Sequence, residues 1–196
     1  MYKVIGTNRS RAFRVTWALE ELGQEYEHVA CGPRSEQANL YNPLGKIPAL
    51  VDGESILTDS TAIVTYLADK HGGLTAKAGS VSRAHQDAMT MWVIDEMDAL
   101  LWSYSKHTRV LPEQQRVAEV GPAVRSEFEN SLVTLADSLG DKPFLMGDAL
   151  SVPDIFATHC IGWSVMAGFP PLPDTLKAYS RRMRARPAYK KAGARS

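Results

Sequence analysis

The chain has 196 residues, with 22 basic and 22 acidic side chains and a formal net charge of zero. That length suits one or two compact domains, and a hydrophobic content of 44% is ordinary for a folded protein. Balanced charge removes the main electrostatic reason to expect nucleic acid or an anionic membrane surface as a partner. The basic run at residues 181–186 is interpreted as a solvated helix end, because cations suit the C-terminus of a helix.

The start of the chain and its cysteines indicate a cytoplasmic protein without a metal. Met1 is followed at once by a strand pattern, with no apolar signal-peptide region, and no stretch is apolar enough to span a bilayer. Cys31 and Cys160 form neither a C-x-x-C pair nor a zinc-ligand spacing. We therefore expect no structural disulfide and no bound metal, and interpret both thiols as inert.

Residues 1–73 mix strand and helix signals. The segments that predict strands are 2–6, 26–30, 47–51 and 54–57. The segments that predict helices are 10–22, a single turn at 35–39, and 58–71. Asp52-Gly53 predicts a hairpin turn between the last two strands, and Gly72 stops the last helix. The order β-α-β and then β-β-α describes a small mixed sheet with helices on its faces.

Strand signals vanish after this region. Residues 74–81 form a small-residue linker and are the expected domain boundary. The segments beyond it that predict helices are 82–107, 112–139, 155–166 and 175–184, and Pro122 is expected to mark a kink or an irregular start within the second of them. Ser151 and Asp154 have the spacing of a reciprocal helix-start motif, with hydrophobic residues at both flanking positions. The helix that follows is apolar on most faces, so we expect it at the centre of the second domain.

The turn between the first strand and the first helix, residues 6–11, is rich in hydrogen-bond donors. It contains Ser10, Arg11 and exposed backbone N–H groups at a place where α/β sheets gather anionic ligands. The alternative is that Ser10 only caps the helix and that the arginines are surface charges.

Two further segments of the first domain have polar groups suited to a ligand. Lys46-Ile47-Pro48 precedes a strand, and a cis bond at Pro48 would leave the Ile47 backbone free to pair with a peptide; a trans turn is the alternative. Asp59 and Ser60 open a helix, where they suit the ammonium and carboxylate of an α-amino acid, or simply cap the helix.

These segments together resemble a known family. Residues 10–23, S-R-A-F-R-V-T-W-A-L-E-E-L-G, resemble the first-helix signature of cytosolic glutathione transferases, particularly a microbial group with the pattern S-R-S-x-R-x-x-W-x-L-E-E-L-G. Residues 42–50, N-P-L-G-K-I-P-A-L, are similar to the family's N-P-x-G-K-[VI]-P-x-L loop. Residues 59–63 are similar to its [ED]-S-x-A-I motif, and residues 151–154 fill the place of its second-domain helix start. The matches follow the family order along nearly the whole chain.

The resemblance implies an α/β thioredoxin-like domain at residues 1–73, a linker at 74–81 and an all-α bundle at 82–196. It implies glutathione as co-substrate, no metal, and a homodimer. The residues that it assigns to glutathione are Ser10, Arg11, Lys46, Ile47, Pro48, Asp59 and Ser60. It implies a cis bond at Pro48 and gives Ser10 the catalytic role of donating to the thiolate. Because family members place this group at different offsets, Thr7, Asn8 and Arg11 stay open as alternatives.

The expected reaction is conjugation of the glutathione thiolate to a small hydrophobic electrophile. The expected electrophile pocket, for which core packing is the alternative, consists of Trp102, Tyr104, His107, Trp163 and Met166. Two other functions stay open: glutathione-dependent reduction of peroxides or disulfides, and non-catalytic glutathione binding in a regulatory protein. The absence of cysteine from residues 6–11 argues against a thiol-exchange subtype with a nucleophile of its own.

Overall fold

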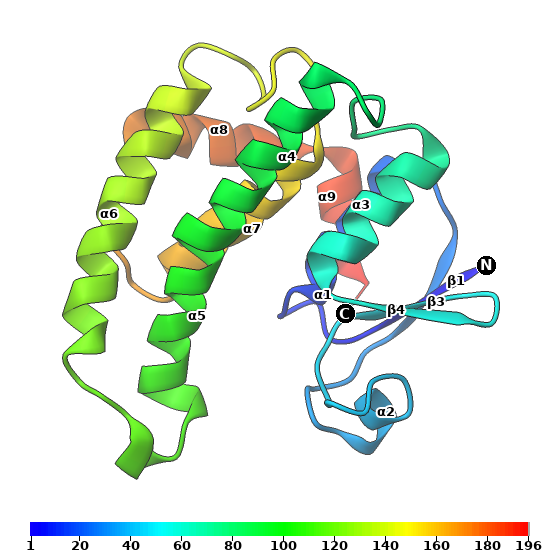
Figure 1. The fold of residues 1–196 in the computed structure, drawn as a ribbon, viewed down its shortest axis with the longest axis horizontal. Coiled ribbons are helices and arrows are strands. Elements are labelled where there is room, and N and C mark those ends of the chain that lie inside the picture. The colour runs from blue at the N-terminus through cyan, green and yellow to red at the C-terminus, as the bar shows by residue number, and fades with distance from the viewer. Residues whose placement is uncertain (196) are drawn as a thin grey trace. The chain divides into compact units, whose positions relative to one another are not determined.

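The computed structural model describes residues 1–195 and divides into two compact units (Figure 1). The first unit combines Met1–Ser80 with the C-terminal segment from Met183, and the second is Val81–Arg182. The expected ranges place the segment from Met183 in the second domain, whereas the structure groups it with the first unit. The assignment of residues 1–73, 74–81 and 82–196 to domains and linker stays a prediction.

A four-stranded mixed sheet forms the centre of the first unit. Its strands are β1 Tyr2–Ile5, β2 Tyr26–Val29, β3 Ala49–Asp52 and β4 Ser55–Thr58. The spatial order is β2-β1-β3-β4, with β1 parallel to β2 and antiparallel to β3, and β4 antiparallel to β3. The predicted strand set and its β-α-β and β-β-α order are confirmed.

The strand register brings three chain segments to one edge of this sheet. Ile5 at the end of β1 lies opposite Ala49 at the start of β3, and Ala49 lies opposite Thr58 at the end of β4. The helices that follow β1 and β4 therefore both begin at this edge. In open α/β sheets, ligands gather at such an edge.

The helices of the first unit are α1 Ala12–Glu21, α2 Glu36–Asn39, α3 Ser60–His71 and α9 Pro187–Ala194. Helix α1 packs against both α3 and α9, so nearly every residue of α1 is buried, including Trp17 with an exposed fraction of 0%. Gly72 ends α3 in the left-handed conformation that its lack of a Cβ favours.

Helix α9 was not predicted from the sequence, and its attachment to α1 corrects the interpretation of Arg186. The rest of the basic run agrees with the expectation, because it lies at the end of α8 with exposed arginines. The Tyr189 ring lies edge-on to Phe13 and Trp17, with ring centroids 4.8 and 5.0 Å apart. Arg186, expected to be solvated, donates from Nε and Nη2 to the two carboxylate oxygens of Glu21 at 2.6 and 2.8 Å. The C-terminal segment is thus held on α1 by aromatic packing and a two-pronged ion pair.

Tyr189→Ala should lower the free energy of unfolding by about 2 kcal/mol, since it removes both ring contacts and their buried area. Lys190→Ala is the matched control, because Lys190 is an exposed neighbour on the same helix; it should change stability by less than about 0.5 kcal/mol. Urea denaturation measures both. Equal stability of the two variants would contradict the packing role of Tyr189.

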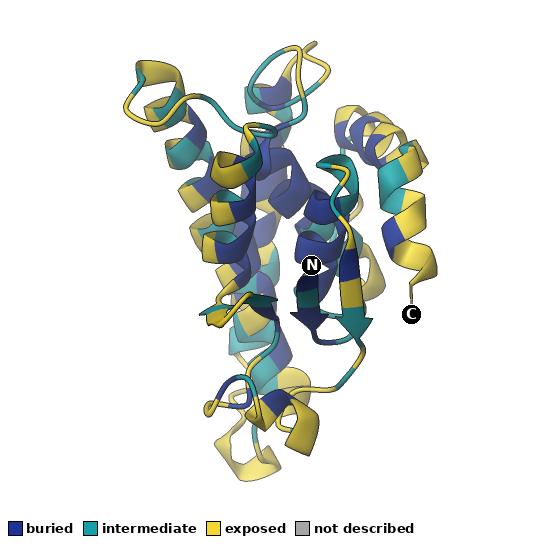
Figure 2. Ribbon diagram, turned by 90° about the vertical axis from the view of Figure 1, so that its right-hand side faces the viewer, coloured by how far each residue is buried: buried dark blue, intermediate teal, exposed yellow. Residues whose placement is uncertain are grey.

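The second unit is helical. Its α-helices are α4 Val81–Val93, α5 Ala99–Ser105, α6 Val120–Leu139, α7 Val152–Met166 and α8 Asp174–Ala185, the last of which runs on into the C-terminal segment. π-Helical segments at Ile94–Asp98 and Lys106–Val110 extend α4 and α5, so the long helix predicted at 82–107 is present with local irregularities. In Figure 2 the helices carry stripes of buried residues that alternate with exposed ones.

The predicted start of the next helix is wrong. Pro112 precedes only a short 3-10 helix, Glu113–Gln115, and α6 begins at Val120. The backbone is extended at Leu111 and Arg116, so no continuous helix crosses this region. The helix-start motif at Ser151 and the apolar, largely buried helix after it are confirmed. Within residues 1–195, no helix combines the length and apolar character needed to cross a bilayer.

Candidate functional site

The three polar segments of the first unit meet at the sheet edge described above. Gly6 follows β1, Pro48 precedes β3, and Asp59 follows β4. The pairing of Ile5, Ala49 and Thr58 fixes this arrangement. Segments far apart in the sequence thus bring hydroxyl, amide and carboxylate groups to the same edge of the sheet.

Ser10 is half-buried, and its hydroxyl already has local partners. Its Oγ donates to the Thr7 carbonyl at 2.7 Å and accepts from the Ala12 N–H at 3.1 Å. The N-cap position of α1 is occupied by the half-buried Arg11, whose side chain makes no capping hydrogen bond. For Ser10 to donate to a bound thiolate, its hydroxyl must rotate away from Thr7.

The Asn8 side chain is held by the C-terminal segment. Its Nδ2 donates to the Ala192 carbonyl at 2.9 Å and to the Arg195 carbonyl at 2.6 Å. Its Oδ1 accepts from the Thr16 hydroxyl at 3.0 Å. These three bonds use both donors and the acceptor of the amide, so Asn8 is occupied in anchoring rather than open to a ligand.

Thr7 has a hydroxyl hydrogen available. Its Oγ1 accepts from the Arg9 N–H at 3.3 Å, and in the part of the chain that the structure describes no acceptor takes the hydroxyl hydrogen. The Thr7 backbone N–H donates to the Cys31 carbonyl and so ties the turn to the end of β2. Thr7 and Ser10 are therefore the two residues of this turn whose hydroxyl groups are candidates for donating a hydrogen bond to a bound thiolate.

The Ile47–Pro48 peptide bond is cis, as the family resemblance implies. Among residues 1–195, neither the N–H nor the carbonyl of Ile47 finds a hydrogen-bond partner, so both are open to an extended chain. The preceding residue, Lys46, is exposed, and its carbonyl accepts from the Asn42 side chain at 3.0 Å. Asn42 thus shapes the loop, a role that the motif match did not assign.

Gly6 permits the close approach of Ile47 to the first turn. Its φ is +128°, and a Cβ at this position would lie 2.9 Å from the Ile47 Cβ. Both the backbone conformation and the space therefore require glycine.

Gly6→Ala should lower the free energy of unfolding by about 3 kcal/mol, because it combines backbone strain with a clash. Gly53→Ala is the matched control: Gly53 also has a positive φ, but a Cβ there meets nothing within 4 Å. Its cost should be only about 1 kcal/mol. Urea denaturation compares the two, and equal losses would contradict the steric argument.

Asp59 caps α3 with one carboxylate oxygen. Its Oδ1 accepts from the Thr61 and Ala62 N–H groups at 2.8 and 3.2 Å. The side chain is exposed, and within residues 1–195 Oδ2 has no hydrogen-bond partner. Asp59 thus serves as the helix cap and keeps an oxygen open to a cation.

Ser60 begins α3 and is 3% exposed. Its Oγ accepts from Nη1 of Arg14, a buried residue of α1, at 3.3 Å. No residue from 1 to 195 accepts the Ser60 hydroxyl hydrogen. The start of α3 therefore combines a hydroxyl donor with the positive end of a helix, which suits an anion.

The residues expected to form the electrophile pocket all lie in the second unit, and two of them have structural partners there. The Tyr104 ring packs edge-on against Phe169 at 4.9 Å, with the Arg125 guanidinium over both rings. Nδ1 of His107 accepts from the Val117 N–H at 3.1 Å. Both side chains therefore support the fold, whatever else they contact.

The other three pocket candidates differ in exposure. Trp102 on α5 and Met166 at the end of α7 are 37% and 82% exposed. Trp163 on α7 is half-buried, and its ring lies 6.2 Å from that of His159. The pocket assignment itself stays a prediction.

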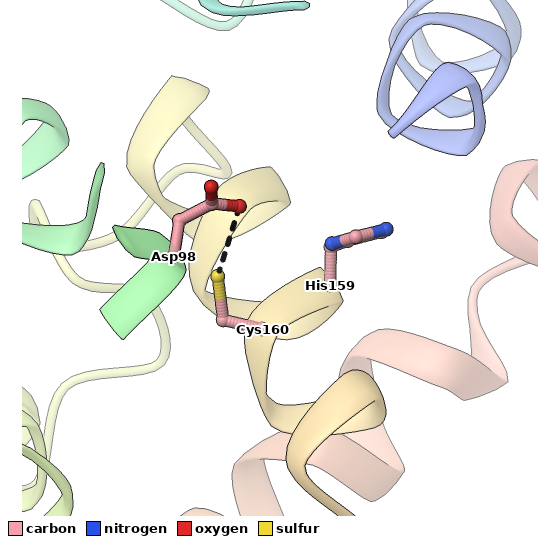
Figure 3. Close-up of side chains that lie close together, drawn as sticks. All are labelled: Asp98, His159 and Cys160. Carbon is pink, nitrogen blue, oxygen red and sulfur yellow. Dashed lines mark hydrogen bonds between the residues drawn. The ribbon is translucent and has the colours of Figure 1, made fainter. Parts of the chain in front are cut away.

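Cys160 and Asp98 are buried in the second unit and lie near the half-buried His159, as Figure 3 shows. Its thiol donates to Asp98 at 3.9 Å, and His159 brings a third potential ligand atom to within 4.8 Å of the others. His159 and Cys160 are successive residues of α7, so their side chains leave the helix in different directions. We interpret the Asp98–Cys160 contact as a hydrogen bond that supports packing.

Comparison with known proteins identifies the family. Residues 6–75 match the family model described as the glutathione S-transferase N-terminal domain. The maize glutathione transferase GST 23 (Zea mays) is 32% identical over 167 residues, which cover 82% of this chain and 69% of that protein. A glutathione S-transferase of wheat (Triticum aestivum) is 46% identical over 63 residues, which cover 32% of this chain and only 30% of the wheat protein.

Solved structures agree with these matches. BphK, a bacterial glutathione transferase solved as a ternary complex, is 28% identical, with a TM-score of 0.86, over 97% of this chain and 96% of its own. The theta-class enzyme of Xanthomonas axonopodis pv. citri, solved with glutathione bound, shares the fold, with a TM-score of 0.80 and 24% identity over 97% of this chain and 96% of its own. The thioredoxin-like and helical architecture is thus confirmed, and the chain belongs to the glutathione S-transferase family.

Proposed function

We propose that the chain binds glutathione at the edge formed by Gly6, Pro48 and Asp59, ionises its thiol and transfers it to small hydrophobic electrophiles. The observation that supports this most strongly is the convergence of a hydroxyl-bearing turn, an unpaired backbone segment and a helix N-terminus. Family membership supports the same reaction class.

Each part of glutathione has a counterpart at this edge. The open N–H and carbonyl of Ile47, beside Pro48, pair with the cysteinyl backbone. Oδ2 of Asp59 accepts from the γ-glutamyl ammonium, and the Ser60 hydroxyl donates to its carboxylate. The exposed Lys46 approaches the glycyl carboxylate, where a flexible ammonium acts as a point charge.

The chemical task is to hold the thiol as a thiolate near neutral pH. A free thiol has a reference pKa near 8.5, and lowering it by about two units takes roughly 2.7 kcal/mol of preferential stabilisation. A hydroxyl donor, the N-terminus of α1 and the Arg11 guanidinium together are adequate for this. We assign the donation to Ser10, with Thr7 as the alternative whose hydrogen is already open.

For the electrophile we propose a binding site lined by Trp102, Tyr104, His107, Trp163 and Met166. Holding the two reactants together adds a proximity contribution to the rate. We further propose a cytoplasmic homodimer that uses glutathione without a metal.

Product analysis tests this function. The protein is incubated with glutathione and either an activated aryl halide or an organic hydroperoxide, and the products are identified by mass spectrometry. Conjugation predicts a thioether with loss of the halide. If glutathione is oxidised in the incubation with the hydroperoxide and no thioether forms with the aryl halide, the reductase function is favoured instead. Saturable glutathione binding without either product would favour a regulatory binding protein.

A further inference from the structure

The C-terminal segment, residues 183–195, belongs to the same unit as the proposed glutathione site, although none of the contacts proposed for glutathione comes from it. Lys191 and Arg195 lie 2.7 and 3.0 Å from the carboxylate oxygens of Glu20, whose side chain is only 3% exposed. The Arg195 guanidinium also lies over the Tyr26 ring, 4.6 Å from its centroid. A nearly buried carboxylate needs such partners, and they fix the end of the chain on α1 and β2.

Asn8 joins this segment to the first turn. Its Nδ2 donates to the carbonyls of Ala192 and Arg195 at 2.9 and 2.6 Å, across 184 and 187 positions of the sequence. The carbonyls at the C-terminal end of a helix have no N–H of a following turn to accept from, so they suit a side-chain amide. The two ends of the chain are thus connected through one side chain.

The first turn is held from three sides. The backbone N–H groups of Gly6 and Thr7 donate to carbonyls at the end of β2 and just beyond it. Asn8, the next residue, accepts from the Thr16 hydroxyl of α1 and donates to the C-terminal segment. Ser10 follows two residues later and donates its backbone N–H to the Thr7 carbonyl. The side chain of Asn8 therefore ties down the part of the turn between the two candidate donors.

The position of these donors matters for thiol activation. A hydrogen bond weakens steeply as its angle departs from linearity, and a misplacement of about 1 Å in a catalytic site can cost about 100-fold in rate. Thr7 and Ser10 lie on either side of Asn8, so a shift of Asn8 moves both hydroxyl groups. The contacts that we propose for the peptide part of glutathione come from Ile47 and Asp59, on other segments of the chain.

We propose that Asn8 is a positioning residue, through which the C-terminal segment holds the first turn in the geometry that donates to the glutathione thiolate. This inference rests on the proposed function and adds a requirement to it. The last residues of the chain take part in lowering the pKa of the bound thiol, and they take no part in recognising the peptide.

The test measures the thiol and the peptide separately. Ultraviolet titration gives the pKa of glutathione bound to the wild type, Asn8→Ala, Arg195→Ala and the double variant. Isothermal titration calorimetry gives the affinity of each for S-methylglutathione, which has no thiol to ionise. Asn8→Ala should raise the pKa of the bound thiol by about one unit, half of the proposed shift. Its affinity for S-methylglutathione should stay within about twofold of the wild type.

Arg195→Ala tests the connection from its far end. The substitution keeps the carbonyl that Asn8 binds and removes the side chain that fixes it to Glu20 and Tyr26. It should raise the pKa of the bound thiol by about half a unit in the wild-type background and by clearly less in the Asn8→Ala background. Lys190→Ala is the matched control, because Lys190 is an exposed cation of the same segment, and it should leave the pKa unchanged.

Three results would overturn the proposal. If Asn8→Ala raises the pKa and Arg195→Ala does not, the amide contacts the ligand directly and does not act for the C-terminal segment. Equal effects of Arg195→Ala in both backgrounds would show that the segment acts by another route. A loss of S-methylglutathione affinity in Asn8→Ala as large as the loss of thiol activation would indicate a merely structural role.

The wild-type arm separates this proposal from the proposed function. If glutathione bound to the wild type titrates as it does in water, thiol activation fails and the role of Asn8 fails with it. A lowered pKa in the wild type that all the variants share would contradict only the role of Asn8. Should Asn8→Ala fail to fold, Arg195→Ala decides alone: a raised thiol pKa with unchanged S-methylglutathione affinity supports the proposal, and an unchanged pKa overturns it.

Discussion

Ser10→Ala is expected to lower kcat/KM for conjugation by about 100-fold, because it removes the hydroxyl that we assign to the thiolate. Most of the loss should be in kcat, since the contacts that bind the peptide part of glutathione are unchanged. Steady-state kinetics with an activated aryl halide measure it. Arg9→Ala is the matched control, because the Arg9 side chain is exposed in the same turn; its kcat/KM should stay within about twofold.

The local bonds of Ser10 make a second variant necessary. Its hydrogen is directed to the Thr7 carbonyl, whereas the Thr7 hydroxyl hydrogen meets no acceptor in residues 1–195. Thr7→Val removes that hydroxyl and keeps the side-chain shape. A small effect in Thr7→Val with the large loss in Ser10→Ala supports our assignment. The reverse pattern would transfer the donor role to Thr7.

Asp154→Ala should lower the free energy of unfolding by about 4 kcal/mol, the largest stability effect that we expect. The carboxylate is fully buried and accepts from the Leu145 N–H, the Ser151 N–H, the Ser151 hydroxyl and the Tyr179 hydroxyl at 2.8–2.9 Å. Burial raises the pKa of Asp154, and these hydrogen bonds oppose that rise. The alanine variant removes the carboxylate acceptor of all four donors and leaves Tyr179 only the backbone carbonyl of residue 154, 3.5 Å away.

Asp154→Asn and Asp148→Ala are the controls for this prediction. The asparagine keeps one acceptor oxygen and should lose less stability than the alanine, while Asp148 is exposed and its substitution should cost less than about 0.5 kcal/mol. Guanidinium denaturation measures all three variants. An Asp154→Ala protein as stable as Asp148→Ala would refute the anchoring role of this carboxylate.

Much of the fold was predictable because residues that favour turns and helix ends separate the strands and helices along the chain. Asp52-Gly53 and Gly72 mark a hairpin and a helix end, and the apolar spacing between such signals identifies strands and helices. Helix α9 was not predicted because the basic run before Pro187 was interpreted as the solvated end of the preceding helix. Its partners, such as Glu21 and Phe13, lie far away in the sequence, where local patterns carry no information about them.

The chain segments that form the candidate site could be predicted from the sequence, whereas the hydrogen bonds of their side chains could not. Linear motifs placed Ser10, Ile47 and Ser60 near one another, and the strand register brings their segments to one sheet edge. The direction of the Ser10 hydroxyl and the Arg14–Ser60 contact depend on packing between elements. Arg14 lies within the first-helix motif, and an arginine on an otherwise apolar helix face was the signal that could have identified it.

The most direct test of thiol activation is an ultraviolet titration of bound glutathione against pH. The thiolate band of glutathione bound to the wild-type protein should appear about two pH units below the titration of the free thiol, whose reference pKa is near 8.5. A bound thiol that titrates as it does in water would contradict activation at this site and leave only the binding of glutathione.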